Sequence, residues 1–519
     1  MSVSEGWWRS GVLYQLYPRS WSDSNGDGVG DLVGITNRLD YLAWLGVDGL
    51  WLNPITPSPN ADWGYDVSDY CDVDPALGDI GALDALINEA SARDISVLLD
   101  LVPNHTSDRH PWFIDARSGR RATHRDYYVW ADPQPDGSPP NNWLSPFGGV
   151  PAWTFDGHTS QYYMHNFLPQ QPDLNWWNQD VRAEFDDIFR FWYERGIAGF
   201  RIDVAHALIK DRELRDNPPA RRGDHPEVIR QGQRHLYSMN RPETHEILGH
   251  WRRLSDSYDP RRVLIGETYV LDLKQMAAFY GTGADELHLA LNFPFLFSSF
   301  TARELRAVVE ETYGSLPRDA WPVWAASNHD AGRFPSRWCD GDPRRVRCAL
   351  MMLLTLRGTP ILYYGDEIGM EEVTIPDEAV RDPAGRDKGR TPMQWSPEPG
   401  GGFSAPSATP WLPLGDHHAN NVEDHRGDPD SVLSFCRDLI SLRRREPALT
   451  SGPYTAIESP KDMWAFRRGR LKVMLNLSDE TMHVNAPDST VVIATLRERD
   501  GAKVRDRIEL GPWEGVVLA

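Results

Sequence analysis

Short apolar segments rich in β-branched residues alternate with longer amphipathic stretches along most of the chain. Between these segments, stretches such as 83–93 and 181–195 place apolar residues three and four positions apart, which is typical of helices packed on one face. Alternating strands and helices of this kind predict parallel βα units, and eight strands predict a (β/α)8 TIM barrel. The eight predicted strands are 12–16, 49–52, 97–101, 199–202, 263–265, 287–291, 323–326 and 359–362.

Two regions lack this alternation of predicted strands and helices. Residues 104–172 are rich in Pro, Gly, Asn and aromatic residues without a helical pattern, which predicts a domain inserted after the third strand. After a helix containing 434–445, short alternating segments at 463–466, 472–475 and 491–493 predict a small antiparallel β domain. The predicted domains are therefore a barrel formed by 1–103 and 173–447, an inserted domain B at 104–172 and a C-terminal β domain at 448–519.

Acidic residues stand at the carboxyl ends of predicted strands, where a barrel carries its active site. In the fourth strand Arg201 and Asp203 share one face, so the guanidinium can orient the carboxylate and hold it ionised. The fifth strand ends at Glu267, and the seventh leads to His329 and Asp330. Any one of these could be a salt-bridged rim residue, but three together favour a catalytic site.

Glycoside cleavage proceeds through an oxocarbenium-like transition state and needs two carboxyl groups that flank the bond. Asp203 is the candidate nucleophile and Glu267 the candidate proton donor. A third carboxylate, Asp330, can orient sugar hydroxyls and stabilise positive charge.

The amino-acid composition argues against some classes of ligand for this protein. The chain has 54 Lys and Arg against 75 Asp and Glu, a net charge of −21, which argues against nucleic acid and against anionic membranes. Its 21 Trp residues suit either a carbohydrate site or a large aromatic core. The start of the chain lacks a signal-peptide pattern and the four cysteines lack C-x-x-C spacing, so a cytoplasmic location is expected.

An early loop places oxygen-bearing side chains at alternate positions among glycines, as a Ca²⁺ ion requires. These residues are Asp23, Asn25, Asp27 and Asp31. A metal-free turn rich in Asx residues is the alternative. The glycines do not follow the G-x-G-x-x-G spacing of dinucleotide-binding loops, and no organic cofactor is expected.

Four runs resemble, in order and context, the signature regions of the α-amylase superfamily, glycoside hydrolase family thirteen. The resemblance extends over nearly the whole chain, and the run Gln-Pro-Asp-Leu-Asn at 171–175 is similar to the oligo-1,6-glucosidase and α-glucosidase branch. The four runs are Asp-Leu-Val-Pro-Asn-His at 100–105, Gly-Phe-Arg-Ile-Asp at 199–203, Gly-Glu at 266–267 and Asn-His-Asp at 328–330.

The resemblance implies a retaining double displacement, with Asp203 as nucleophile, Glu267 as acid/base and Asp330 binding the 2- and 3-hydroxyls. It further implies that His105, Arg201 and His329 contact the innermost glucose. A structural calcium site is also implied, with the carbonyl of Val29 joining the four side chains of the early loop.

The resemblance also implies exo action, through a second group of residues around the non-reducing glucose. Asp62 and Arg390 would grip the 4- and 6-hydroxyls of the non-reducing glucose as an ion pair that closes the site, and Tyr65 would stack on the ring. Phe147 and Phe167 in the insert are candidates for the wall of the site.

The substrate is predicted to be a small oligosaccharide or glucoside, and the oligomeric state is left open. Within the branch that the chain resembles, Val at the position of Val204 accompanies α-1,6 cleavage, whereas the residues around it resemble maltose-preferring enzymes, so α-1,4 is favoured. The same site could perform transglucosylation or a trehalose-synthase-like isomerisation. A non-catalytic interaction protein of this fold would lack the full catalytic set and carry a membrane segment, and neither applies to this sequence.

Overall fold

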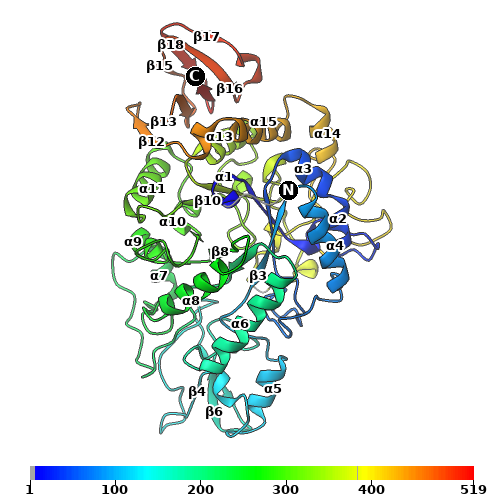
Figure 1. Ribbon diagram of the computed structural model, residues 1–519, viewed down its shortest axis with the longest axis vertical. Coiled ribbons are helices and arrows are strands. Elements are labelled where there is room, and N and C mark those ends of the chain that lie inside the picture. The colour runs from blue at the N-terminus through cyan, green and yellow to red at the C-terminus, as the bar shows by residue number, and fades with distance from the viewer. Residues whose placement is uncertain (1–5, 383) are drawn as a thin grey trace.

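The computed structural model describes residues 6–382 and 384–519, and its centre is a parallel sheet curled into a nearly closed barrel (Figure 1). The strand order is β10-β11-β1-β2-β3-β7-β8-β9, and all seven neighbouring pairs run parallel. Each of the eight predicted segments forms one of these strands, which confirms the predicted barrel. The strands are β1 (Leu13–Leu16), β2 (Gly49–Leu52), β3 (Ser96–Leu101), β7 (Gly199–Ile202), β8 (Val263–Gly266), β9 (Leu289–Ala290), β10 (Val323–Ala325) and β11 (Thr359–Tyr363).

Helices cover the outside of the barrel, so the strands are buried on both faces and consist almost entirely of apolar residues. Several helices begin at a side-chain cap; Asp79 accepts a hydrogen bond from the amide of Ala82 at the start of α4, and Thr301 caps α11 in the same way. The main covering helices are α2 (Leu32–Asn37), α3 (Leu39–Leu45), α4 (Ile80–Ser91), α6 (Gln179–Glu194), α8 (Thr244–Asp256), α9 (Leu273–Ala278), α11 (Ala302–Ser315), α13 (Pro343–Thr355) and α15 (Val432–Arg445).

Between β3 and α6 the chain leaves the barrel and forms a small antiparallel sheet. Its strands β4 (Trp130–Ala131), β5 (Trp153–Asp156) and β6 (Gln161–Met164) follow α5 (Pro111–Arg117), in the order β4-β6-β5. Bridges from His105 to Asp173 and from Tyr128 to Leu174 bring the two ends of this region together. This region leaves the barrel at the carboxyl end of β3.

A second excursion, between β7 and α8, was not predicted from the sequence. It covers 203–243 and contains one short helix, α7 (Pro226–Gln231). Its polar, glycine- and proline-containing sequence has no strong period, so only its length marks it as more than a connecting loop.

The C-terminal region forms an antiparallel sheet in the order β12-β13-β14-β19-β16-β17, with a two-stranded ribbon of β15 and β18, which confirms the predicted β domain. It follows α15 at the top of Figure 1, next to α13. No helix in the described ranges 6–382 and 384–519 combines the length and apolar character needed to span a bilayer. The C-terminal strands are β12 (Tyr454–Ile457), β13 (Met463–Arg468), β14 (Leu471–Asn476), β15 (Met482–Asn485), β16 (Ser489–Ala494), β17 (Lys503–Val504), β18 (Arg507–Leu510) and β19 (Gly515–Leu518).

Candidate active site

One buried guanidinium, Arg201 on β7, holds three carboxyl groups at the carboxyl ends of neighbouring strands. Its Nη1 lies 2.7 Å from both Asp100 Oδ1 and Asp203 Oδ1, and its Nη2 lies 2.6 Å from Glu267 Oε2. These carboxyl groups come from β3, β7 and β8, which are adjacent in the sheet. The predicted pairing of Arg201 with Asp203 is present, and Glu267 shares the same cation.

The electrostatics of this cluster favour retention of a proton. Burial raises the pKa of Asp100 to about 6. Burial also raises the pKa of Asp203, with the neighbouring Glu267 carboxyl adding to the rise and the Arg201 guanidinium opposing it. The raised pKa of Asp203 is the opposite of the expectation that Arg201 holds this carboxylate ionised, because burial and the neighbouring carboxyl groups outweigh the guanidinium. With three carboxyl groups around one cation, the cluster favours a state in which one of them is protonated.

The residue after Asp203 has an unusual backbone. Val204 has a φ of 35°, in the left-handed region that β-branched residues rarely adopt. This conformation points its amide N–H at Glu267 Oε2, 3.0 Å away. The strained turn therefore fixes the Glu267 carboxyl group relative to the Asp203 loop.

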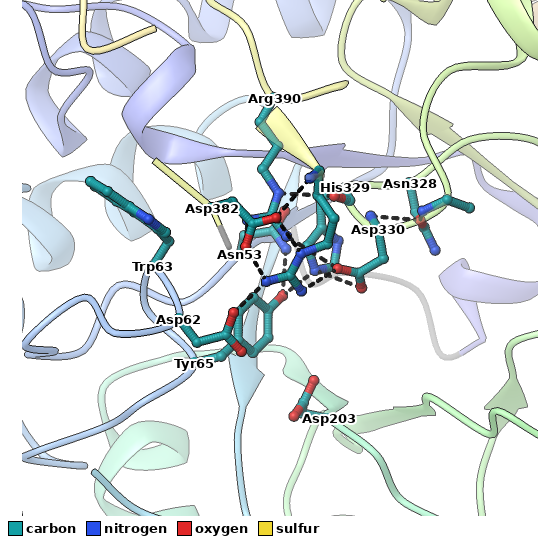
Figure 2. A network of polar contacts seen from close by, with 12 residues as sticks. Asn53, Asp62, Trp63, Tyr65, Asp203, Asn328, His329, Asp330, Asp382 and Arg390 are labelled. Atoms are coloured by element: carbon teal, nitrogen blue, oxygen red, sulfur yellow. Dashed lines mark hydrogen bonds and ion pairs between the residues drawn. The ribbon is translucent and has the colours of Figure 1, made fainter. Parts of the chain in front are cut away.

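Asp330 lies in a second network, shown in Figure 2. His329 Nε2 lies 3.1 Å from Asp330 Oδ2, and Arg386 Nη1 and Arg390 Nη2 lie 3.0 and 3.1 Å from Asp330 Oδ1. Although burial opposes it, these cationic and imidazole neighbours hold the pKa of Asp330 well below its usual range. Asp330 is therefore an anion.

His329 is a neutral ring in this network. Gln15 Nε2 donates to its Nδ1 at 2.8 Å, which leaves the proton on Nε2, and burial lowers the pKa of the imidazole. The ring of Tyr65 stacks on it at 5.3 Å with an interplanar angle of 7°, and the Tyr65 hydroxyl donates to Asp100. Tyr65 thus connects the Asp330 network to the Arg201 cluster.

The predicted ion pair between Asp62 and Arg390 is wrong. The structure pairs Asp62 with Arg386, whose guanidinium also contacts Asp382 and Asp330. Arg390 is fully buried and donates to the His329 carbonyl at 2.9 Å and to Asp330. The two arginines lie four positions apart in one loop, and nothing in the sequence indicates which of them pairs with Asp62.

The insert supplies the remaining wall. His105 Nε2 donates to the Tyr65 carbonyl at 2.9 Å, and burial lowers the pKa of this imidazole. Phe167 packs edge-on against His105, and Phe147 packs against Phe167. Gln171, which sequence reasoning used only as part of a family motif, donates to Asp62 Oδ2 at 3.0 Å.

These residues surround a cavity of about 990 Å³. Asp203 also faces this cavity. Figure 2 shows it separated from the hydrogen-bonded network of Asp62, Asp330 and Arg390. Arg201, His329 and Arg390 lie behind the lining, where they orient the carboxyl groups. The predicted residues that line the cavity are Asp62, Tyr65, His105, Phe147, Phe167, Asp203, Glu267 and Asp330.

Sequence reasoning also missed a buried lysine behind this wall. Lys210 Nζ lies 2.7 Å from Asp173 Oδ2, 2.6 Å from Asn104 Oδ1 and 2.7 Å from the Ala207 carbonyl. Asn104 is the first residue of the insert, Asp173 directly follows its last residue, and Lys210 follows the nucleophile loop. This ion pair therefore fixes the insert to the loop that carries Asp203.

The early loop keeps its oxygen-rich composition in the structure. Asp23 accepts hydrogen bonds from the amides of Gly26 and Gly28 and from Ser404 Oγ, and Asp31 accepts one from the Gly34 amide as the N-cap of α2. Within residues 6–382 and 384–519, no three His, Cys, Asp or Glu side chains are arranged to hold a metal ion. The calcium site stays a prediction, supported by the chemistry of its hard oxygen donors.

Comparison with known proteins gives consistent relatives. The family model described as "Alpha amylase, catalytic domain" matches residues 15–452. A probable alpha-glucosidase of Rhizobium meliloti is 44% identical over 93% of this chain and 91% of its own length, and an oligo-1,6-glucosidase of Parageobacillus thermoglucosidasius is 35% identical over 98% of each.

Among solved structures, the alpha-glucosyl transfer enzyme XgtA superposes with a TM-score of 0.91 at 38% identity, covering 99% of both chains. The barrel, the carboxyl groups at its strand ends and these relatives agree. The chain belongs to the α-amylase family of glycoside hydrolases.

Proposed function

We propose that this chain is a retaining exo-α-glucosidase that releases α-glucose from the non-reducing end of short α-glucosides. The observation that carries the proposal is the arrangement of Asp203 and Glu267 on one guanidinium. Because both carboxyl groups contact the same guanidinium, they lie close together, which favours the separation of about 5–5.5 Å used by retaining enzymes over the wider spacing of inverting ones.

In this mechanism Asp203 attacks the anomeric carbon while Glu267 gives its proton to the departing oxygen. The same Glu267 carboxylate then takes a proton from water, which attacks the anomeric carbon and releases Asp203. Asp330, held as an anion by Arg386 and Arg390, is placed to bind hydroxyls and stabilise the positive charge of the ring.

Exo action is supported by the ion pair of Asp62 and Arg386, which takes the place of the expected pair with Arg390. Both residues line the cavity, and Arg386 also packs its guanidinium 5.3 Å from the Phe147 ring centroid. A closed end of this kind accommodates one terminal sugar and leaves no room for further units beyond it.

The test is a time course on maltose and isomaltose, with the anomeric form of released glucose followed by NMR. We expect α-glucose to appear first, maltose to be cleaved faster than isomaltose, and Asp203→Asn to lower kcat by about 10⁴-fold or more. Asp187→Asn, a carboxylate exposed on α6, is the matched control and should behave as wild type. Initial release of β-glucose, or equal rates for Asp203→Asn and wild type, would contradict the proposal.

Glucosyl transfer is the second candidate activity. The cavity continues beyond the carboxyl groups along residues 223–240, so it has space for an acceptor after the first product leaves. The ratio of oligosaccharide products to free glucose at high maltose concentration measures this activity.

For the early loop we propose a structural Ca²⁺ site formed by Asp23, Asn25, Asp27, Asp31 and the Val29 carbonyl. The ion would supply charge neutralisation and rigidity to the segment before α2, and no step of the reaction depends on it. Dialysis against EGTA should lower the melting temperature by a few degrees, since a ligand bound at about 100 times its Kd contributes about 2.7 kcal/mol. Asp27→Ala should abolish that response, and an EGTA effect that persists in this variant would place the ion elsewhere.

A further inference from the structure

A second cavity lies outside the active site, between α3 and α14 (Val422–Gly427), the blue and gold helices at the upper right of Figure 1. Its volume is about 620 Å³, within the range of pockets that bind small molecules. The buried rings of Tyr41 and Trp395 form part of its lining. It shares no described lining residue with the active-site cavity, so it is a separate candidate ligand site.

The first cation in this cavity is Arg38, which directly precedes α3. Its guanidinium carbon lies 4.3 Å from the centroid of the Trp395 ring, and its Nη2 donates to the Gly402 carbonyl at 2.9 Å. Burial lowers the pKa of this guanidinium, and no carboxylate among the described residues opposes the fall. Arg38 is therefore a partly desolvated cation without a neighbouring anion to compensate the lost hydration.

Two further cations meet on one neighbouring ring. The guanidinium carbons of Arg426 on α14 and Arg437 on α15 lie 4.5 and 4.7 Å from the centroid of the Trp44 ring, which stacks on Tyr41. Neither arginine forms an ion pair or a hydrogen bond with the part of the chain that the structure describes. In a chain with 54 basic and 75 acidic residues, like charges gathered without a carboxylate partner form a local positive site.

One acidic side chain also lines the cavity. Glu423 is exposed on α14, and its backbone amide donates to the Trp395 carbonyl at 3.0 Å. Although it stands three positions before Arg426 on the same helix, the two side chains do not form an ion pair within the described ranges 6–382 and 384–519. The described lining thus carries two guanidinium groups against one carboxylate, which leaves a net positive charge.

We propose that this cavity binds a phosphate dianion, either inorganic phosphate or the phosphate group of a small phosphomonoester. Arg38 and Arg426 would donate N–H groups to its oxygens, and Arg437 would add positive charge from the adjoining ring. A guanidinium matches phosphate geometry with two parallel N–H groups, and a dianion neutralises two cations at once. The site is independent of the proposed activity, since it lies apart from the catalytic carboxyl groups.

The experiment is calorimetric titration of the full chain with inorganic phosphate and, separately, with glucose 6-phosphate, in a buffer of about 20 mM ionic strength to limit screening. Wild type should show saturable binding, and Arg426→Gln should raise the Kd about tenfold. This variant should fold, because the Arg426 side chain is exposed. The absence of saturable binding of both probes up to about 10 mM would overturn the proposal.

The matched control is Arg230→Gln, because Arg230 lines the active-site cavity and pairs with Glu227. Its Kd for phosphate should equal that of wild type. If Arg230→Gln lost binding and Arg426→Gln kept it, the anion would lie in the active-site cavity and the assignment would be overturned.

Two other variants test the charge balance of the cavity in opposite directions. Glu423→Gln removes the one carboxylate of the described lining and should lower the Kd about threefold, whereas Arg38→Lys keeps the charge but loses the paired donors and should raise it about fivefold. A lower Kd for glucose 6-phosphate than for inorganic phosphate in wild type, abolished by Arg426→Gln, would support a phosphomonoester as ligand. Equal values would support free phosphate. Unchanged affinity in Arg426→Gln, Glu423→Gln and Arg38→Lys would overturn the site.

Discussion

Two fully buried arginines sit in different parts of the molecule and are satisfied by different groups. Arg201, at the carboxyl ends of the barrel strands, contacts three carboxyl groups. Arg443 on α15, in the contact between the barrel and the C-terminal region, donates to backbone carbonyls alone among the residues that the structure describes. These carbonyls belong to Ser10, Leu354, Leu356, Gly358 and Leu449.

The partners of each arginine distinguish a site suited to proton transfer, around Arg201, from one that only stabilises the fold, around Arg443. Carbonyl dipoles at the end of α13 are fixed, so Arg443 can satisfy otherwise unpaired acceptors but cannot take part in proton transfer. Burial lowers the pKa of its guanidinium to about 9, the positive charge of Arg468 adds to the fall, and Asp48 opposes it only in part. Around Arg201 the carboxyl groups outnumber the cation, and that excess of negative charge keeps one proton available for catalysis.

The largest expected effect comes from Arg201→Lys. A lysine keeps one positive charge but cannot hold Asp203 and Glu267 with two separate nitrogens. We expect kcat on maltose to fall about 10²–10³-fold, as when one preorganised electrostatic contact is lost. Circular dichroism and a urea titration of the same protein establish that the fold persists. A variant with normal kcat would show that the three-carboxylate cluster is not required for the reaction.

Arg443→Met is the converse test. Removing the guanidinium leaves several buried carbonyls without donors, which should lower the free energy of unfolding by about 3 kcal/mol. The active site lies at the other end of the barrel, so kcat at 25 °C should stay within about twofold of wild type. Urea denaturation and initial rates on maltose measure the two quantities. A large fall in kcat without loss of stability would remove the distinction between the two arginines.

The sequence predicts the barrel and its Arg201 site much better than it predicts the surroundings of Arg443. All eight barrel strands were found because residues buried on both faces leave a continuous apolar run. Asp203, Glu267 and Asp330 follow directly from strand ends, which meet at one rim in a parallel barrel. Arg443, in contrast, belongs to a run of three arginines on an amphipathic helix, and its burial depends on which face packs against α13.

The errors fall where loops determine the geometry. Arg386 and Arg390 are both in an irregular segment, where no periodicity states which side chain reaches Asp62. The excursion at 203–243 and the Lys210 ion pair likewise depend on contacts between segments far apart in the sequence. Local patterns predict regular elements well, while long-range contacts of loops become visible only when the chain is folded.

The smallest expected effect concerns a carboxyl group that forms no ion pair with any residue the structure describes. Asp366 follows β11, is fully buried, and accepts a hydrogen bond from the Tyr363 amide, while its Oδ1 has no partner among the described residues. Burial raises its pKa to about 7. Because this folded-state pKa lies above the unfolded value of about 3.9, the folded protein binds the extra proton, and this stability is present at low pH and lost as pH rises toward 7.

Asp366→Asn therefore tests whether a buried carboxyl without a cationic partner is kept neutral. Wild type should lose about 2 kcal/mol of unfolding free energy from this group between pH 5 and pH 7, and the variant should lack that part of the slope. Urea denaturation at several pH values measures it, with Asp187→Asn as an exposed control. Identical pH slopes for wild type and Asp366→Asn would mean that Asp366 is ionised in the folded protein. The number of cations around a buried carboxyl group would then not predict whether that group keeps its proton.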